Sequence, residues 1–473
     1  MTLPIVRPRP DVPALAERFP SAFVWGAATA AYQIEGAPSA DGRGPSIWDT
    51  FAHTPGRVAN GDTGDVACEH YVRYPGDVDL MRDLGIGAYR LSVSWPRIHP
   101  DGGPRVEPRG LDFYRRLVDE LLDADIEPWL TLYHWDLPQP LEDAGGWPVR
   151  DTAYRFAEYA ATVHDALGDR VSKWITLNEP WCSAFLGYAS GVHAPGRTEP
   201  AASLPATHHL LLGHGLALEA LRQNGSRAEI GITLNTFDVH SVSDSPADLD
   251  AARRIDGLHN RLFLDPVLLG RYPADVLEDL ASLGDQTFIR AEDLPLIGAP
   301  IDHLGVNYYH ALYVEGVADG AVADVRGRPT PYPNAERVRL VRTGRPLTAI
   351  GWEVDGAGIT RALTRIHRDY PEVPVVVTEN GAAYDDVVSP DGTVDDPERL
   401  AYVEQHVGAV ADAVDAGVPV TGYFVWSLLD NFEWAEGFAK RFGIVYVDFA
   451  TQERIVKASG LWYAGLAGGP GSP

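Results

Sequence analysis

Cysteine is nearly absent from this sequence: the 473 residues include two, Cys68 and Cys182. They form no CxxC pair, which argues against a disulfide framework and against a cysteine-ligated metal site. We therefore expect both thiols to be reduced and structural. Long apolar runs are also missing. No stretch of about 18 apolar residues occurs, so we expect no membrane-spanning helix.

Positive charge is scarce as well. The chain has 39 Lys and Arg residues against 66 Asp and Glu residues, a net charge of −27 at pH 7. Nucleic acids and anionic membranes bind clustered cations, so we expect neither as a partner. The first twenty residues, MTLPIVRPRPDVPALAERFP, lack the apolar core of a signal peptide. We expect a cytoplasmic protein, either a monomer or a homo-oligomer.

What the chain does contain is a recurring strand-like run followed by a helical pattern. Most runs are continuously apolar, as is typical of parallel strands buried on both faces. The eight runs are FVWGAATAAYQ (23–33), AYRLSVSW (88–95), EPWLTLYHW (127–135), SKWITLNEP (172–180), GITLNTFDV (231–239), HLGVNYY (303–309), PVVVTENG (374–381) and GYFVWSLLD (422–430).

Two stretches between the runs show the helical pattern clearly. In residues 151–169 one helix face carries Phe156, Ala160, Val163 and Leu167, and Gly168 is the expected stop. In residues 396–417 we expect Asp396 to cap the helix and Pro397 to occupy its first position. The shared face of this second helix carries Val403, Val407, Val410 and Val414.

Eight strands alternating with helices predict an α/β fold, a (β/α)₈ TIM barrel. A doubly wound sheet fits less well, because no Gly-rich phosphate fingerprint follows the first strand. We expect a single domain over 1–473, with the ordered barrel over about 15–465 and a Gly/Pro tail over 466–473. The segment 310–348 is expected to form an extended loop on the rim.

Polar or aromatic residues stand at the end of each run. In chain order these are Gln33, Arg90, His134, Trp135, Asn178, Glu179, Asn235, Asn307, Tyr309, Glu379, Trp426, Glu433 and Trp434. In a barrel the strand ends meet on one face, where active sites lie. The run VVVTENG then has a simple interpretation: the dry strand mounts Glu379 rigidly, and Gly381 lets the backbone turn sharply behind it.

Two carboxylates, several amides, a histidine and flat aromatic rings fit the chemistry of glycoside hydrolysis. One carboxylic acid protonates the leaving oxygen, while the other carboxylate attacks the sugar or activates water. Amide and imidazole groups bind hydroxyls, and tryptophan faces cover the C–H face of a sugar ring. No metal or cofactor is needed for this reaction, and we expect none.

Six segments, in order, resemble glycoside hydrolase family 1, the retaining β-glucosidases. They cover nearly the whole chain and are FVWGAATAAYQIEGA (23–37), GDTGDVACEHY (61–71), TLNEPW (176–181), GYASGVHAPG (187–196), VTENG (377–381) and WSLLDNFEW (426–434). The resemblance implies hydrolysis of small-molecule β-glycosides, namely β-glucosides and cello-oligosaccharides, and also β-galactosides and β-fucosides.

The same resemblance implies roles for four residues. Glu179 would be the general acid/base and Glu379 the nucleophile, with Arg90 and Tyr309 stabilising the Glu379 anion. A neighbouring anion in a partly dry pocket would raise the pKa of Glu179. Retention through a covalent glycosyl-enzyme would place the two carboxyl groups ~5–5.5 Å apart.

Sugar and aglycone contacts also follow from the resemblance. Asn178 would bond the sugar 2-hydroxyl, and Trp426 would form the stacking floor. The other sugar hydroxyls would be held by Gln33, His134, Glu433 and Trp434, with Trp135 and Asn307 also in the substrate-binding set. The aglycone side would be lined by Trp181, Leu186, Tyr188, His193 and Trp352.

Several alternatives stay open. Asn235 either contacts Asn178 or fills the pocket. A metal site is the less favoured reading of the acidic turn with Asp62, Asp65, Glu69 and His70. A 6-phospho-β-glycosidase would need cations near the sugar 6-position; Lys440 and Arg441 are candidates, but Glu433 would repel a phosphate. A non-catalytic sugar-binding barrel and a metal-dependent sugar isomerase are the other rivals.

Overall fold

The computed structural model describes residues 12–223, 228–318 and 330–468. Eight parallel strands close into a barrel in the order β1-β11-β10-β7-β5-β4-β3-β2, and β1 also pairs with β2. The (β/α)₈ prediction is therefore confirmed. The strands are β1 (Val24–Ala28), β2 (Ala88–Ser92), β3 (Glu127–Tyr133), β4 (Lys173–Asn178), β5 (Glu229–Asn235), β7 (His303–Asn307), β10 (Val375–Asn380) and β11 (Val420–Trp426).

Each of the eight apolar runs overlaps one barrel strand, and β5 and β11 each begin two residues before their runs. The first run is longer than its strand, because Gln33 lies on the short helix α2 (Ala31–Ile34) and not on β1. Along β10 every residue is buried, including the polar Thr378, Glu379 and Asn380. Strand β10 thus holds the Glu379 carboxyl group in a buried and rigid environment.

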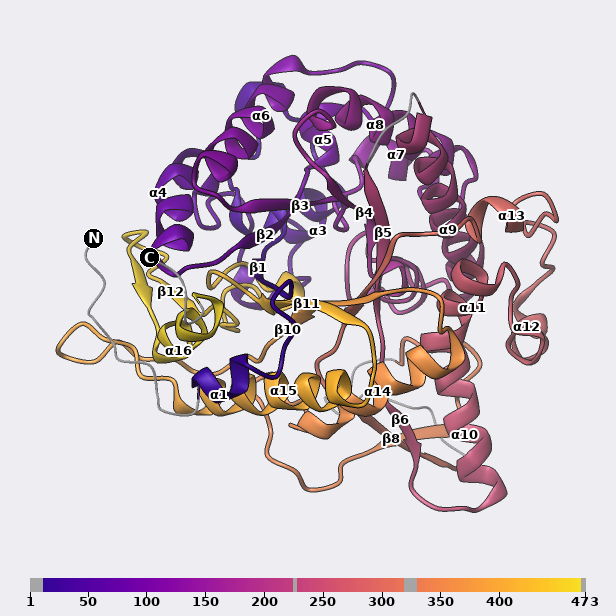
Figure 1. Cartoon of the computed structure of the whole chain (residues 1–473). Coiled ribbons are helices and arrows are strands. Elements are labelled where there is room, and N and C mark those ends of the chain that lie inside the picture. Colours follow the sequence, from indigo (N-terminus) through magenta and orange to yellow (C-terminus); the bar gives the residue numbers. More distant parts are fainter. Residues whose placement is uncertain (1–11, 224–227, 319–329, 469–473) are drawn as a thin grey trace.

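Helices surround the barrel on its outside (Figure 1). The longer ones are α4 (His70–Asp83), α6 (Pro108–Asp123), α8 (Asp151–Leu167), α9 (Pro200–Arg222), α10 (Pro246–Asp256), α11 (Leu262–Leu269), α14 (Gly356–Asp369), α15 (Pro397–Asp415) and α16 (Ala458–Ala467). The shorter ones are α1 (Val12–Ala16), α3 (Ile47–Ala52), α5 (Trp95–Ile98), α7 (Gln139–Asp143), α12 (Ala274–Leu280) and α13 (Leu294–Ile297). Within the described ranges, no helix is both long and apolar enough to cross a bilayer.

The two helices expected from periodicity are present. In α8 the whole predicted face is buried, and the helix ends at Leu167 with Gly168 as its C-cap. In α15 Pro397 is the first residue and Asp396 occupies the N-cap position as predicted, but the Asp396 side chain makes no capping hydrogen bond. Its carboxylate binds Arg399 and the Ser459 hydroxyl instead of the helix N-terminus. An ion pair with a buried guanidinium outcompetes a backbone N–H for this carboxylate.

The segment 310–348 is not simply a loop, so that prediction needs correction. It contains β8 (Leu312–Gly316) and β9 (Val338–Val341), which pair antiparallel, and β8 also pairs with β6 (Val239–Ser241). Residues 319–329 of this segment, like 469–473 of the expected tail, lie outside the described residues. Helix α16 runs two residues into the stretch expected to be tail. A second small sheet joins β12 (Val445–Val447) to β13 (Arg454–Val456).

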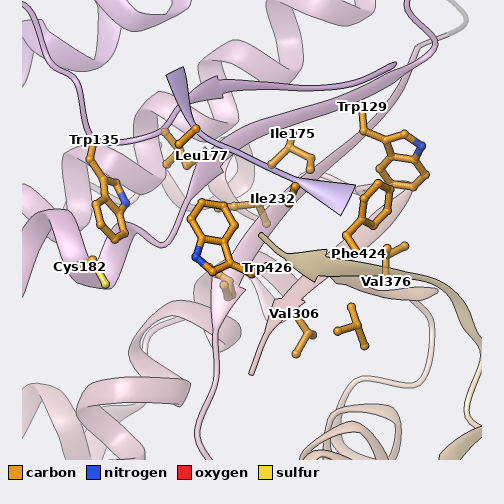
Figure 2. Close-up of a cluster of buried hydrophobic side chains, with 14 of the residues drawn as sticks. Trp129, Trp135, Ile175, Leu177, Cys182, Ile232, Val306, Val376, Phe424 and Trp426 are labelled. Carbon is orange, nitrogen blue, oxygen red and sulfur yellow. The ribbon is translucent and has the colours of Figure 1, made fainter. Parts of the chain in front are cut away.

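The barrel interior is filled by side chains from many strands (Figure 2). The Trp129 and Phe424 rings lie with their centroids 5.1 Å apart, near the end of the barrel where the strands begin. Gly26 makes room for this packing, since a Cβ there would come within 2.3 Å of the Phe424 ring. Toward the opposite end the interior layer includes Trp426, which borders the candidate site.

Candidate active site

The two glutamates singled out by the sequence lie in one pocket. Glu179 directly follows β4, and Glu379 is the fifth residue of β10. Both line a pocket of about 180 Å³. Their side chains are almost fully buried, with exposed fractions of 6% and 3%. Two carboxyl groups so close and so dry must differ in their surroundings, because both cannot easily carry a charge there.

Glu379 is held on both oxygens by donors. The Arg90 guanidinium donates from Nη1 to Oε1 at 2.5 Å, and the Tyr309 hydroxyl donates to Oε2 at 2.7 Å. The Arg90 side chain is fully buried, so its charge acts in a poorly screened setting. A guanidinium on one oxygen and a hydroxyl donor on the other both stabilise the ionised form of the Glu379 carboxyl group.

Glu179 has a less polar set of neighbours. Its Oε1 accepts from Asn307 Nδ2 at 2.5 Å, and its Oε2 accepts from the Cys182 thiol at 2.9 Å. Burial, followed by the nearby Glu379 charge, raises the pKa of Glu179 to about 7. The backbone at Glu179 has a φ of 48°, an uncommon conformation for a side-chain-bearing residue. This carboxyl group can hold or release a proton near neutral pH.

Asn178 connects the two glutamates through hydrogen bonds. Its Oδ1 accepts from Arg90 Nη2 at 2.6 Å and from Asn307 Nδ2 at 3.0 Å. Its Nδ2 donates to His134 Nε2 at 3.1 Å. Burial and the Arg90 charge lower the pKa of His134 well below its ordinary value, so the ring is neutral and can accept. The Trp135 indole N–H donates to the Asn178 carbonyl at 2.9 Å.

The far wall of the pocket combines aromatic rings with a buried carboxyl group. The His134 ring stacks with both Trp426 and Trp434, each with centroids 5.8 Å apart. Gln33 Nε2 donates to the Phe432 carbonyl at 2.9 Å and approaches Glu433 Oε2 at 3.5 Å. Burial, then the neighbouring Glu436 charge, raises the pKa of Glu433 to about 8. This wall offers flat faces and hydrogen-bonding groups side by side.

The structure brings all fourteen predicted site residues to this region. Those that line the pocket are His134, Trp135, Glu179, Trp181, Asn307, Tyr309, Trp352, Glu379, Trp426, Glu433 and Trp434. The other three, Gln33, Arg90 and Asn178, lie behind the wall and bond lining residues. Of the softer assignments, Leu186 and His193 line the pocket.

Tyr188 does not belong to the aglycone side, and that expectation is wrong. The residue is buried, its hydroxyl donates to Glu142 Oε2 at 2.5 Å, and it accepts from the Trp147 backbone N–H at 3.1 Å. The segment Cys182–Ala189 forms a π-helix, in which residues face other directions than in an α-helix. Tyr188 therefore points into the protein.

Two other open questions are answered by the contacts. Asn235 lines the pocket and bonds Cys182 and His259, so the structure favours the pocket-filling alternative over a contact with Asn178. In the acidic turn Asp62 accepts from the Phe438 backbone N–H at 2.9 Å, while Glu69 pairs with Arg73. Among the residues that the structure describes, no cluster suited to a metal ion occurs.

Sequence reasoning missed several pocket residues. Cys182 was interpreted as a plain structural thiol, yet its sulfur contacts Glu179. Its position three residues after Glu179 was the available signal. The other lining residues were not singled out from the sequence: Val192, Phe237, His310, Ile350, Glu436 and Phe442.

A second pocket of about 190 Å³ continues from the first. The two share six lining residues, namely Trp181, Leu186, Val192, Phe237, His310 and Trp352. The second pocket extends to the small sheet at β8 and β9, where Tyr313 and Leu340 line it. The site is thus a deep polar end joined to an apolar outer part.

Comparison with known proteins agrees with this geometry. Thermostable β-glucosidase B of Thermobispora bispora is 54% identical over 452 residues, 94% of this chain and 89% of that protein. The bifunctional β-D-glucosidase/β-D-fucosidase of Bifidobacterium breve is 47% identical over 456 residues, 94% of this chain and 97% of that protein. The solved structure of a β-glucosidase from Thermotoga maritima in complex with glucoimidazole superimposes with a TM-score of 0.88 at 47% identity, covering 94% of this chain and 98% of that one.

The family model for glycosyl hydrolase family 1 matches residues 15–471. The match spans all eight barrel strands and both pocket glutamates. Together with the close relatives, it shows that this chain belongs to glycosyl hydrolase family 1.

Proposed function

We propose that this protein is a retaining β-glucosidase that removes terminal, non-reducing β-D-glucosyl residues through a covalent glycosyl-enzyme. One observation carries the proposal: two glutamates in one pocket stand in opposite electrostatic surroundings. Glu379 is bound by a guanidinium and a hydroxyl, whereas burial and the adjacent charge raise the pKa of Glu179 to about 7. A retaining glycosidase needs one ionised and one protonated carboxyl group.

In the first step a Glu379 oxygen attacks the anomeric carbon while the glycosidic bond breaks. Glu179 gives its proton to the leaving oxygen, so the aglycone departs as a neutral alcohol. The sugar is then joined to Glu379 as an ester. Because Glu379 has lost its charge, one cause of the raised Glu179 pKa is removed.

In the second step Glu179 acts as a base. It takes a proton from water while the water oxygen attacks the anomeric carbon, and the ester bond to Glu379 breaks. Glu379 regains its charge, and Arg90 and Tyr309 again donate to it. Two inversions at one carbon leave the product with the configuration of the substrate.

Residues around the two glutamates are proposed to recognise the sugar. Arg90 and Asn307 orient the Asn178 amide, which supports its assignment to the 2-hydroxyl, and Trp426 is assigned the stacking face. The remaining hydroxyls are assigned to four residues by similarity to the family: Gln33, His134, Glu433 and Trp434. The apolar second pocket would take the aglycone or further glucose units.

The charge of the pocket favours a neutral sugar over a phosphorylated one. Glu433 and Glu436 both line the pocket. The nearby cations are committed elsewhere, since Lys440 donates to the Ala349 carbonyl at 2.8 Å and Arg441 pairs with Asp430. Turnover of a 6-phosphoglucoside without turnover of the unphosphorylated analogue would reverse this conclusion. Since the Bifidobacterium breve relative is named for both activities, we also propose activity on β-fucosides.

Trapping with a 2-deoxy-2-fluoro-β-glucoside tests the proposal. The fluorine slows breakdown of the ester, so we expect one sugar bound per chain, on the peptide that contains Glu379. Glu379→Ala should abolish both labelling and release of nitrophenol from a nitrophenyl β-glucoside. Labelling at another residue would remove Glu379 from its role. Absence of turnover would favour a sugar-binding protein, and loss of activity with a chelator would favour a metal-dependent enzyme.

A further inference from the structure

A chain of hydrogen bonds leads from Glu179 away from the sugar end of the pocket. The Cys182 thiol lies 2.9 Å from Glu179 Oε2, and Asn235 Nδ2 lies 3.8 Å from the Cys182 sulfur. Asn235 Nδ2 is also 3.2 Å from His259 Nε2. His259 Nδ1 is 3.0 Å from the Tyr332 hydroxyl, which lines the second pocket. The chain therefore joins the catalytic carboxyl group to the aglycone wall.

The direction of each bond follows from chemistry. Burial and the nearby Glu179 raise the pKa of the Cys182 thiol well above its ordinary value, so the sulfur keeps its proton and donates. Burial lowers the pKa of His259 well below its ordinary value, so the ring is neutral. Its Nε2 accepts from Asn235, which leaves the proton on Nδ1 to donate to Tyr332.

The two amide hydrogens of Asn235 are then both used. One is donated to His259 and the other to the Cys182 sulfur. The histidine is held between the Phe237 ring, with centroids 4.0 Å apart, and the Trp181 ring at 4.3 Å. Asn235 and His259 therefore cannot easily reorient. Because Asn235 is held in place, its hydrogen bond to the sulfur fixes the orientation of the Cys182 side chain.

Cys182 is well suited to hold an acid that must give up its proton. A carboxyl group with one donor on each oxygen has a fixed plane, and here the donors are Asn307 and Cys182. A thiol is a weak donor, so it orients the carboxyl group without favouring its ionised form as strongly as a hydroxyl would. A general acid stays effective when its carboxyl group is held in one orientation and its ionised form is only weakly stabilised.

We infer that Cys182 is a positioning residue for the acid/base Glu179, and that Asn235 and His259 hold its thiol in place. The inference rests on the proposed function, since it assigns a role relative to Glu179. The thiol acts in both steps: it fixes the carboxyl group toward the leaving oxygen, and it supports the carboxylate that later receives a proton from water.

Several charged and polar groups near Glu179 act on its pKa. Burial and the Glu379 charge raise the pKa of Glu179, whereas Cys182, Asn307 and the Arg90 charge lower it. Tyr309 and Glu433 are also close enough to interact with Glu179 electrostatically. Removing the thiol donor alone should therefore raise the pKa of Glu179.

The test compares the pH dependence of kcat/KM in Cys182→Val and Cys182→Ser, using an aryl glucoside with a poor leaving group. In the wild type we expect activity to fall above a pH near 7. Cys182→Val should move this alkaline limb upward by about half a pH unit to one unit, because the carboxylate loses a donor. Cys182→Ser restores a donor, so its limb should lie at or below that of the wild type.

Cys68→Val is the matched control. Cys68 is also buried and donates through its thiol, but to the Asp430 carbonyl at 3.1 Å and not to the pocket. Its alkaline limb should match the wild type even if its unfolding temperature falls. An unchanged limb in folded Cys182→Val, or equal movement in the Val and Ser variants, would overturn the inference.

A double-mutant cycle tests the rest of the chain. Asn235→Ala should move the limb in the same direction as Cys182→Val but less, since the thiol remains while its orientation is lost. In Cys182→Val/Asn235→Ala the second change should add nothing, because Asn235 acts through the thiol. Additive shifts would show that Asn235 affects Glu179 by another route and would remove it from the chain.

Failure of this inference can be told apart from failure of the proposed function. Glu179→Gln should abolish the alkaline limb if Glu179 is the acid/base. If that limb persists in Glu179→Gln, the acid/base assignment itself is wrong. If the limb disappears in Glu179→Gln but does not respond to Cys182→Val, only the positioning role is wrong.

Discussion

At the scale of single residues, the site shows how one residue type serves two roles. Glu179 and Glu379 have the same side chain, and both are almost fully buried in one pocket. Their difference lies in the partners, since Glu379 faces a guanidinium while Glu179 faces an amide and a thiol. In the proposed mechanism, the different surroundings of the two glutamates make one an acid and the other a nucleophile.

Removing the acid should affect poor leaving groups most. In Glu179→Ala we expect kcat/KM for an alkyl or unactivated aryl β-glucoside to fall by at least about 10²-fold, the usual contribution of general acid catalysis. A dinitrophenyl glucoside should lose much less in the first step, because an activated phenolate leaves without a proton. Steady-state rates over a series of leaving groups give the measurement. Equal losses across the series would contradict the acid role.

Glu433→Gln probes the sugar end of the pocket. The substitution keeps the shape of the side chain but removes a group that can bond hydroxyls as a carboxylate. Above about pH 8, where Glu433 is ionised, we expect kcat/KM for a β-glucoside to fall roughly 10- to 100-fold relative to the wild type, the value of a hydrogen bond to a charged group. Glu436→Gln, one turn further along the same pocket wall, is the control and should cost much less. Unaltered kinetics in Glu433→Gln would exclude the contact.

At the scale of elements, strand β10 illustrates what the sequence can and cannot reveal. Its apolar run and the glutamate at its end are visible in the sequence, and both are confirmed as parts of a buried barrel strand. The reason for Gly381 differs from the expected one. A Cβ at this position would lie 1.7 Å from the Trp426 carbonyl oxygen, so the glycine is needed for the close approach of β11.

Gly381→Ala should therefore disrupt the site without changing any functional group. The methyl group would force β10 and β11 apart, which displaces Glu379 and Trp426 together. We expect kcat/KM to fall by at least about 10²-fold, since small misplacements of reacting groups are that costly. The control is Gly408→Ala, because Gly408 lies in α15 and has open space at its Cβ. Gly392 is not suitable as a control because its φ is 82°. Full activity in Gly381→Ala would disprove the packing argument.

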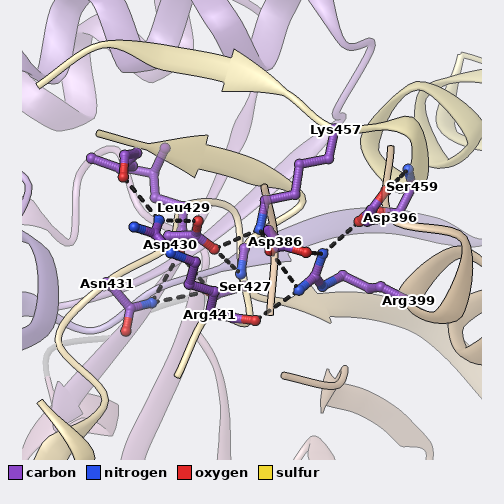
Figure 3. Close-up of polar contacts among 12 residues, drawn as sticks. Asp386, Asp396, Arg399, Ser427, Leu429, Asp430, Asn431, Arg441, Lys457 and Ser459 are labelled. Carbon is purple, nitrogen blue, oxygen red and sulfur yellow. Dashed lines mark hydrogen bonds and ion pairs between the residues drawn. The ribbon is translucent and has the colours of Figure 1, made fainter. Parts of the chain in front are cut away.

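The loop after β11, which carries Glu433, is anchored by a buried ion cluster (Figure 3). Lys457 Nζ lies 2.6 Å from Asp430 and 2.5 Å from Asp386, and Arg399 bridges Asp386 to Asp396. Asp430 also accepts from the Gly443 backbone N–H at 3.0 Å. Residues that are distant in the sequence thus meet in one buried cluster, which holds the loop after β11.

Breaking this cluster should be costly. Lys457→Met leaves two buried aspartates short of a cation, for which we expect a loss of about 3–5 kcal/mol in the free energy of unfolding. Arg18→Met removes an exposed pair with Asp412 and Asp415 and should cost less than about 1 kcal/mol. Denaturant unfolding of both variants makes the comparison. A similar small loss in each would show that the cluster adds little stability.

Other elements show which features could be predicted from the sequence and which could not. The strand ends and their polar residues were predictable because apolar runs stop at motif residues. Tyr188 was misplaced because nothing in the sequence reveals that Cys182–Ala189, which contains it, forms a π-helix. Strands β8 and β9 were missed because each is short and half exposed, so neither forms a dry run. Contacts such as Cys182 to Glu179 depend on side-chain directions that no periodicity encodes.

At the scale of the whole molecule, buried titratable groups of two kinds set the dependence of stability on pH. Burial is the main cause that raises the pKa of Glu179 to about 7 and of Glu433 and Asp136 to about 8. Each of these groups binds a proton more tightly when folded, so its stabilisation is complete at low pH. It is lost as pH rises toward 8.

Buried histidines act in the opposite direction. Burial lowers the pKa of His209, His303 and His310 to about 4, below the ordinary value of 6.5. The unfolded chain then binds more protons between pH 4 and 6.5, so stability falls as the solution is acidified through this range. The three carboxyl groups oppose this change between about pH 4 and 6.5, but burial also lowers the pKa of His214 to about 3 and of His406 to about 4, so the histidines outnumber them. Above pH 6.5 only the carboxyl groups act, and the two sets together predict a maximum of stability near neutral pH.

We expect the unfolding temperature to be highest between about pH 6 and 7 and to fall on both sides. Scanning calorimetry at constant ionic strength measures it. Asp136→Asn should flatten the alkaline side, because the buried carboxyl group no longer has to ionise. An unfolding temperature that rises steadily from pH 6 to 9 would contradict the assignment of the raised carboxyl groups.

Closure of the barrel has a consequence for biosynthesis. The first strand pairs with the last, and Gln33 Nε2 donates to Asn431 Oδ1, which lies 398 positions later. A nascent polypeptide emerging from the ribosome therefore contains both proposed catalytic glutamates once residue 379 is made, but it still lacks Glu433 and Trp434, which are proposed to bind the sugar. The protein should hydrolyse substrate only after β11 and the residues that follow it have been made. Partially synthesised or truncated molecules should therefore be inactive toward substrate in the cell.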